Sequence, residues 1–98
     1  MRIEISTDAH DDLARGFAFY ERQEQSLGSY FADTLYSEME SLQIYAGIHP
    51  IRNGFYRMLT HRFPYSVYYR IENETARIYA VLDNRMNPVS IRAMLGGR

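Results

Sequence analysis

Apolar and polar residues follow two different repeats along this chain, and the change from one to the other falls near Pro50. Before it, apolar side chains recur every three or four residues, which is the repeat of an amphipathic helix. After it, they alternate with polar side chains, which is the repeat of a strand with one buried face. The stretch MRIEIS at residues 1–6 is the exception, because Ile3 and Ile5 alternate with polar residues and predict a short first strand.

Two helices are predicted in the first half of the chain. Ser6, Thr7 and Asp8 are all residues that cap helix N-termini, so a helix is expected to begin there. Its apolar stripe consists of Ala9, Leu13, Phe17 and Tyr20. The stretch QEQSLGS interrupts this stripe, and a second one runs to Ala46 through Leu27, Phe31, Leu35, Met39 and Leu42, with Gly47 suited to the position after the helix. We therefore expect a helical hairpin, with Phe17 and Leu35 in the core.

Three strands are predicted after Pro50, at residues 53–60, 62–71 and 76–83. In the middle one, RFPYSVYYRI, the odd positions are apolar or aromatic: Phe63, Tyr65, Val67, Tyr69 and Ile71. We expect this face, with Val67 and Tyr69 in the core, to pack against the helices. The even positions are Arg62, Pro64, Ser66, Tyr68 and Arg70, and they predict a surface for a partner on which Tyr68 is exposed.

The last strand, ARIYAVLD, is apolar on both faces, as is typical of a central strand. Strict alternation places Ala76, Ile78, Ala80 and Leu82 on one face and Tyr79 and Val81 on the other. The turn-rich residues 72–75 predict an antiparallel hairpin with the preceding strand. Asn87, Pro88 and Gly96 then suit the cap, the first position and the end of a short helix, which we expect to lie outside the core layers.

The predicted fold is α+β, in the order β-α-α-β-β-β, with a helical hairpin on one face of a mainly antiparallel sheet and a short C-terminal helix or arm. A chain of 98 residues suits a single domain spanning 1–98.

Several classes of function are disfavoured by composition. The chain has no cysteine and its three histidines, His10, His49 and His61, are scattered, so neither a disulfide nor a metal site is expected. No apolar stretch approaches the ~18 residues that span a bilayer, and no leader is recognisable, so we expect no membrane contact and a cytoplasmic location. No motif predicts a cofactor: Gly96-Gly97 reads as a helix end rather than a phosphate loop.

Charge is divided unevenly along the chain. Residues 1–49 carry three arginines and nine acids, whereas residues 50–98 carry eight arginines and three acids, and there is no lysine. The basic half suits acidic partners or phosphates. The sequence pI of about 6.3 lies below the range typical of nucleic-acid binders, so we expect no sequence-specific DNA binding by this chain alone.

Three stretches carry a resemblance that covers nearly the whole chain: FYERQEQSLGSYFADTL, YRMLTHRFPYSVYYRIENETARIYAVLD and the closing RMNP. Together they resemble the RelE/ParE superfamily of type II toxin-antitoxin toxins, most closely its ParE-like, plasmid-stabilisation members. The resemblance implies a toxin that inhibits bacterial growth until a cognate antitoxin neutralises it. RelE-like members cleave mRNA on the ribosome, whereas ParE-like members inhibit DNA gyrase.

The candidate residues depend on which mechanism applies. For a ribonuclease they are Arg57, His61, Arg62 and Arg85, since RNA cleavage needs cations and a group that moves protons. Residues 86–98 contain neither Tyr nor His, and lysine is missing, so this constellation is incomplete. For contact with a partner protein the candidates are Arg57, Arg62, Tyr68, Arg70, Arg77, Arg85 and Arg92, because guanidinium groups pair with carboxylates. The alternative for Arg85 is a structural ion pair, with Asp83 or a helix acid as partner.

The first interpretation is thus a ParE-like toxin that inhibits gyrase without being an enzyme. The alternatives are a RelE-like mRNA endonuclease acting on the ribosome, and an interaction module of the same fold that has lost toxicity.

Overall fold

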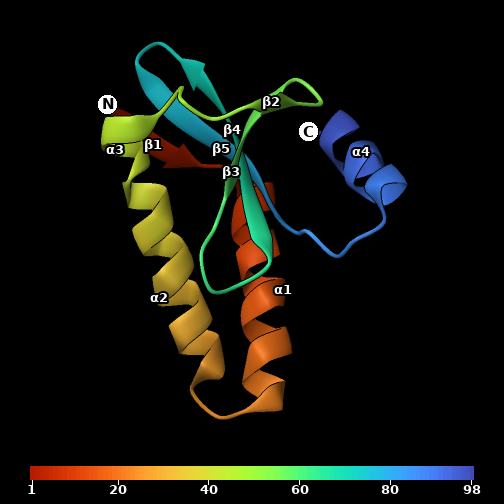
Figure 1. Cartoon of the computed structure of the whole chain (residues 1–98). Helices are drawn as coiled ribbons and strands as arrows, with labels where there is room; N and C mark the ends of the chain where they lie inside the picture. Colours follow the sequence, from red (N-terminus) through yellow and green to blue (C-terminus); the bar gives the residue numbers. More distant parts are fainter.

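The computed structural model describes all 98 residues (Figure 1). Its elements are β1 (Arg2–Ile5), α1 (Thr7–Gln23), α2 (Leu27–Glu40), α3 (Leu42–Tyr45), β2 (Ile51–Arg52), β3 (Phe55–Leu59), β4 (Tyr65–Glu72), β5 (Thr75–Asp83) and α4 (Pro88–Gly96). The predicted α+β fold is confirmed, with β2 as a short addition. The helix predicted to run to Ala46 is instead divided at Ser41 into α2 and α3. No helix combines the length and the apolarity that crossing a bilayer requires.

The five strands form one sheet in the order β1-β5-β4-β3-β2. β1 runs parallel to β5, and the other neighbours are antiparallel. The predicted hairpin between β4 and β5 is confirmed: Glu72 pairs with Thr75, and the two residues between them have φ of 50° and 61°. Two consecutive positive φ values match the right-handed twist of the strands, so this turn fixes their register.

The helical hairpin of α1 and α2 is built by two capping side chains. Ser6 caps α1 by accepting a hydrogen bond from Ala9 N, as its sequence position predicts. Glu21 accepts hydrogen bonds from the backbone N–H groups of Ser26 and Gly28, each at 2.9 Å, and so holds the start of α2 against the end of α1. Figure 1 shows the closed end of this hairpin projecting away from the sheet.

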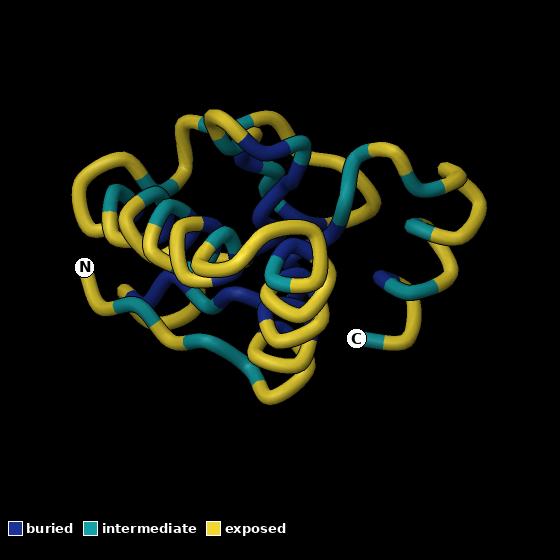
Figure 2. The backbone as a smooth tube through the Cα atoms, turned by 90° about the horizontal axis from the view of Figure 1, so that it is seen from below, coloured by how far each residue is buried: buried dark blue, intermediate teal, exposed yellow.

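The main core lies between the hairpin and one face of the sheet. Leu35, Val67 and Tyr69 have no exposed surface, which confirms their predicted positions. In Figure 2 the buried segments run through the centre of the molecule, and the outer turns of the helices are exposed. The prediction for Phe17 is wrong: its side chain is 38% exposed, because Gly16 faces the core instead and leaves room for the Phe31 ring.

A β-bulge in β5 overturns the strict alternation predicted for that strand. Tyr68 pairs with Ala80 and Tyr69 pairs with Ile78, so Tyr79 is an extra residue without a partner in β4. An extra residue reverses which side chains face which side of the sheet. Val81 therefore joins the main core with Ile78, whereas Ala80 turns to the opposite face.

The opposite face is covered by α4. Leu95 of α4 is 2% exposed and packs in a second cluster with Phe55, Tyr68, Ala80 and Leu82. The expectation that this arm lies outside the core layers is therefore wrong. The even face of β4 is likewise no open partner surface at Ser66 and Tyr68, whose exposures of 0% and 3% result from this cover.

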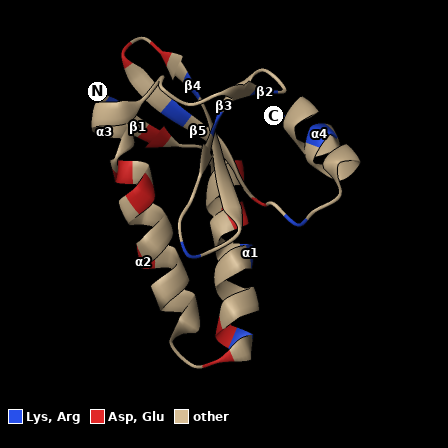
Figure 3. Cartoon of the chain, viewed as in Figure 1, with Lys and Arg blue, Asp and Glu red and all other residues tan.

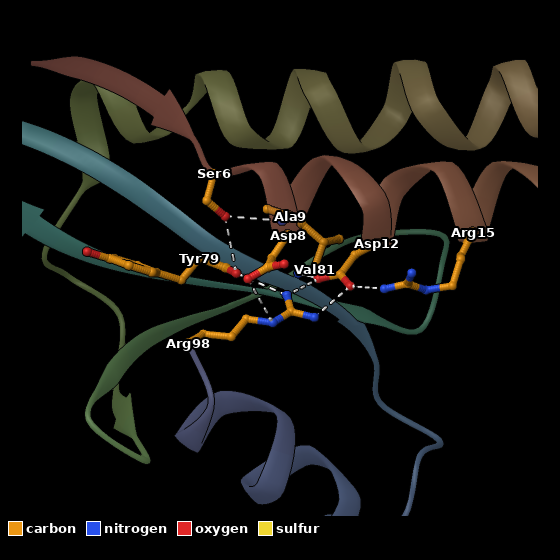
Figure 4. A network of polar contacts seen from close by, with 8 residues as sticks. All are labelled: Ser6, Asp8, Ala9, Asp12, Arg15, Tyr79, Val81 and Arg98. Carbon is orange, nitrogen blue, oxygen red and sulfur yellow. Dashed lines mark hydrogen bonds and ion pairs between the residues drawn. The ribbon is translucent and has the colours of Figure 1, made fainter.

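The end of α4 is fixed to α1 by a buried ion pair (Figure 4). The Asp12 side chain is 2% exposed and that of Arg98 is 10% exposed. Arg98 NH1 and NH2 donate to the two carboxylate oxygens of Asp12 at 2.5 and 3.0 Å. Asp12 also accepts from Val81 N at 2.9 Å and from Arg15 at 2.6 Å. One carboxylate thus joins α1, β5 and the end of the chain.

Candidate functional site

A groove of about 620 Å³ lies between the outer strands of the sheet and the segment formed by the last turn of α2, α3 and the loop that follows. β2 pairs with Phe55 and Tyr56 of β3, and Arg57 N donates to Pro50 O at 2.8 Å, so only the end of β3 beyond Arg57 has no partner on its outer side. Apolar side chains border this open edge, including Ile48 and Leu59, which are 72% and 58% exposed. An open strand edge beside an apolar groove is the arrangement that receives an extended or amphipathic peptide segment.

Arg57 and His61, two of the predicted residues, both line this groove. His61 Nδ1 lies 2.6 Å from Glu38 Oε1, which also accepts the backbone N–H of His61 at 3.0 Å. A carboxylate in this position orients the imidazole ring through the hydrogen bond. The pair therefore fixes a histidine beside a guanidinium at the groove wall.

His49 is a further residue of the groove wall that the sequence did not single out. Tyr69 Oη accepts a hydrogen bond from Gly47 N at 2.9 Å and lies 2.5 Å from His49 Nδ1. Because the hydroxyl already accepts from Gly47, its own proton is directed to His49. Burial raises the pKa of Tyr69 and lowers the pKa of His49, so both rings favour their neutral forms. Gly47 has φ of 99°, as suits the glycine predicted after the helix.

A second, polar hollow of about 240 Å³ lies between the β2–β3 hairpin and α4. Three arginines line it: Arg52, Arg57 and Arg92. Arg57 Nε donates to Ser66 Oγ at 3.1 Å, and Ser66 Oγ donates to Asn84 Oδ1 at 2.5 Å. Arg57 therefore borders both hollows, and its guanidinium is held by a buried hydroxyl.

Arg62 and Arg85 lie apart from these two hollows. Arg62 donates to the Tyr30 hydroxyl on α2. Arg85 makes the ion pair with Asp83 that was the alternative for this residue, with NH2 2.7 Å from Oδ2. Hydrogen bonds from Arg85 hold the pKa of Asp83 below its usual value. The four candidates for a ribonuclease thus do not share one hollow.

The other predicted partner residues have different surroundings. The Arg70 guanidinium lies 4.0 Å from the centre of the Phe55 ring, a cation–π geometry. Arg77 lies 3.4 Å from Glu4. Tyr68 was expected to be exposed, and this is wrong: its side chain is 3% exposed beneath α4, so a partner has no access to it.

Acidic and basic side chains are distributed unevenly over the elements of the fold (Figure 3). The helical hairpin carries most of the acids, whereas the arginines of residues 50–98 lie on the strands, the connecting loops and α4. No cluster of three or more His, Asp or Glu side chains is placed to hold a metal ion.

Comparison with known proteins bears on both the fold and the family. A solved structure described as the "Chromosomal ParDE TA system from P. aeruginosa" matches with a TM-score of 0.74 at 17% sequence identity, over 83% of this chain and 92% of the other. At this identity the likeness shows a shared fold. No curated protein matches the chain. The family described as "ParE toxin of type II toxin-antitoxin system, parDE" matches residues 3–88. This match spans β1 to the first residue of α4, and the chain thus belongs to the ParE toxin family.

Proposed function

We propose that this protein is a toxin that binds and inhibits DNA gyrase in the cytoplasm, and that a cognate antitoxin neutralises it. Family membership supports the general role of a toxin. The observation that carries the proposal is the groove beside the open end of β3, because this arrangement suits a protein segment. Its apolar walls suit burial of side chains from a partner.

The antitoxin is the partner that this groove suits. We propose that an extended segment pairs with the free side of β3 near Leu59 while an amphipathic helix covers Tyr45 and Ile48, which are 53% and 72% exposed. Arg52 and Arg57 at the same wall provide guanidinium groups for acidic side chains of that segment. Raising the salt concentration should weaken the complex only partly, since buried contacts are screened less than exposed charges.

Gyrase is proposed as the target because the basic surface suits binding rather than catalysis. Arginine stays protonated at neutral pH, so the surface candidates Arg62, Arg70, Arg85 and Arg92 bind anionic groups but do not shuttle protons. Arg85 is 59% exposed at its side chain even while paired with Asp83, so a carboxylate of the target has access to it. Exchange of one carboxylate for another at an exposed pair costs little free energy.

One observation favours the ribonuclease as a second candidate. His61 is oriented by Glu38 beside Arg57 in a groove, which is a geometry that activates a hydroxyl and stabilises a phosphate. Against it, Arg62 and Arg85 lie elsewhere, so only one cation accompanies the histidine.

The two mechanisms are separated by inducing expression of the protein in bacteria. We expect loss of supercoiling activity in purified gyrase, intact mRNA minutes after induction, and a weaker effect for Arg85→Ala. His61→Ala should retain full toxicity. Codon-positioned mRNA cleavage that disappears in His61→Ala would establish the ribonuclease instead. Absence of both effects, with normal growth, would contradict the toxin assignment as a whole.

A further inference from the structure

The polar hollow between the β2–β3 hairpin and α4 is built from hydrogen-bond donors. Ser66 is completely buried, and its single hydroxyl proton is directed to Asn84 Oδ1 while its oxygen accepts from Arg57 Nε. Because Oδ1 of Asn84 is occupied, the amide presents its NH2 group, which makes no hydrogen bond within the chain. The two terminal nitrogens of Arg57, which lines the same hollow, make no hydrogen bond within the chain. The buried hydroxyl therefore sets two side chains in a donating orientation.

The charge of the hollow is uniformly positive. Arg52 and Arg92 line it together with Arg57, and no Asp or Glu does. None of the three arginines lies within ion-pair distance of any carboxylate of the chain. By contrast, Arg77, Arg85 and Arg98 all have carboxylate partners. Three unneutralised guanidinium groups around one hollow repel one another unless an anion lies between them.

We propose that this hollow binds a phosphate group. A phosphate offers several acceptor oxygens, and arginine matches its geometry with paired N–H groups. A single carboxylate has two oxygens and one charge, which satisfies fewer of the donors on Arg52, Arg57, Arg92 and Asn84. Free pyrophosphate and the backbone of a nucleic acid share this chemistry, and both fit a hollow of about 240 Å³ that opens to solvent.

The site depends on α4, and phosphate binding is measured without gyrase. Arg92 and one wall of the hollow come from α4, which lies almost wholly beyond the residues 3–88 that match the family. The buried pair of Asp12 with Arg98 and the packing of Leu95 hold α4 in place. Phosphate binding therefore requires α4 to be packed against the sheet, and this requirement does not depend on the cellular target of the protein.

Calorimetric titration of the full chain with inorganic pyrophosphate at low salt tests the proposal. We expect binding with one site, and a loss of affinity of roughly tenfold or more in both Asn84→Asp and Arg92→Gln, because a charge-assisted hydrogen bond is removed or opposed. The matched control is Arg22→Gln, which changes the net charge equally at an exposed position on α1, far from the hollow in sequence. Thermal unfolding checks that each variant is folded, and Arg92 is exposed, so its replacement leaves the core intact.

Two further titrations distinguish the sources of the phosphate. A single-stranded oligonucleotide that binds with the same dependence on Asn84 and Arg92 would identify a nucleic-acid backbone, whereas pyrophosphate binding alone would identify a free phosphate compound. Citrate provides the carboxylate comparison. The proposal is wrong if pyrophosphate does not bind, if Arg22→Gln weakens binding as much as Arg92→Gln, or if citrate binds more tightly than pyrophosphate with the same dependence on these residues.

Discussion

Replacing Asp12 with alanine should be among the most damaging single changes in this protein. The carboxylate is 2% exposed and accepts hydrogen bonds from Arg98, from Arg15 and from Val81 N. Alanine removes the carboxylate that hydrogen-bonds the Arg98 guanidinium, itself 10% exposed, and leaves it only the more distant carboxylate of Asp8 at 4.0 Å. It also leaves a buried N–H of strand β5 without an acceptor.

The magnitude follows from these two losses. Removing one partner of a buried ion pair costs about 3–5 kcal/mol, because the other charge stays buried and uncompensated. We therefore expect Asp12→Ala to lower the free energy of unfolding by about 3–5 kcal/mol, a large share of the ~5–15 kcal/mol that stabilises a typical domain. Arg98→Met keeps the apolar stem and leaves Asp12 bonded to Arg15 and Val81 N, so about 1–3 kcal/mol is expected. The double variant should cost about 1–3 kcal/mol less than the sum of the two.

Urea unfolding followed by far-ultraviolet circular dichroism measures these values, since the chain contains no tryptophan. Asp11→Ala on the exposed side of α1 is the control and should change stability by no more than about 0.5 kcal/mol. The reasoning fails if Asp12→Ala costs less than about 1 kcal/mol, or if the Asp12 and Arg98 effects are additive.

Three further outcomes are expected. Gly16→Ala should destabilise the fold by about 1–3 kcal/mol in thermal unfolding, because the added Cβ would lie 2.5 Å from Cζ of the buried Phe31 ring; a gain in stability, as helix propensity alone would give, contradicts this. Leu35→Ala should cost about 2–5 kcal/mol through cavity formation, whereas Tyr36→Ala at a 38% exposed position should cost far less, and equal losses in urea unfolding would be evidence against the core assignment. Burial raises the pKa of Tyr65 from 10.0 to about 12, so the unfolded chain loses this proton first. The contribution of Tyr65 to stability is constant below pH 10 and should fall between pH 10 and 12; Tyr65→Phe should reduce that slope, and an unchanged slope would refute the cause.

Much of the fold follows from local patterns. The stripe of α2, the cap at Ser6 and the core-facing odd positions 65–69 of β4 each depend on residues close in sequence, and the structure has them as predicted. The errors in the predicted fold arise where a single residue changes which side chains of a strand or helix face the core. Tyr79 is an ordinary strand residue, and nothing in the composition of β5 indicates that it bulges. The prediction that Phe17 is buried fails for a similar reason. Gly16 faces the core in its place, because the absence of a side chain there leaves room for a neighbouring ring.

The candidate site was harder to predict than the fold. Arg57 could be predicted as a site residue because it is an arginine on a strand in the basic half of the chain. Ser66 and Asn84, which orient it, could not, because their contacts depend on the register between strands and on the loop after β5. The alternation of β4 predicts an exposed Tyr68 because no local pattern indicates that α4 folds back over that face.

The parallel pairing of β1 with β5 also determines when this protein is complete during its synthesis. Ile3 pairs with Ala76, so the first strand cannot pair with β5 until more than seventy further residues have been translated. Through that interval the apolar stripes of the hairpin have no sheet to cover them, because chains emerge from the N-terminal end. The groove beside β3 likewise takes shape only with β4 and β5 in place. The protein therefore acquires its binding surface late in translation, and ribosomes carrying partial chains display none of it.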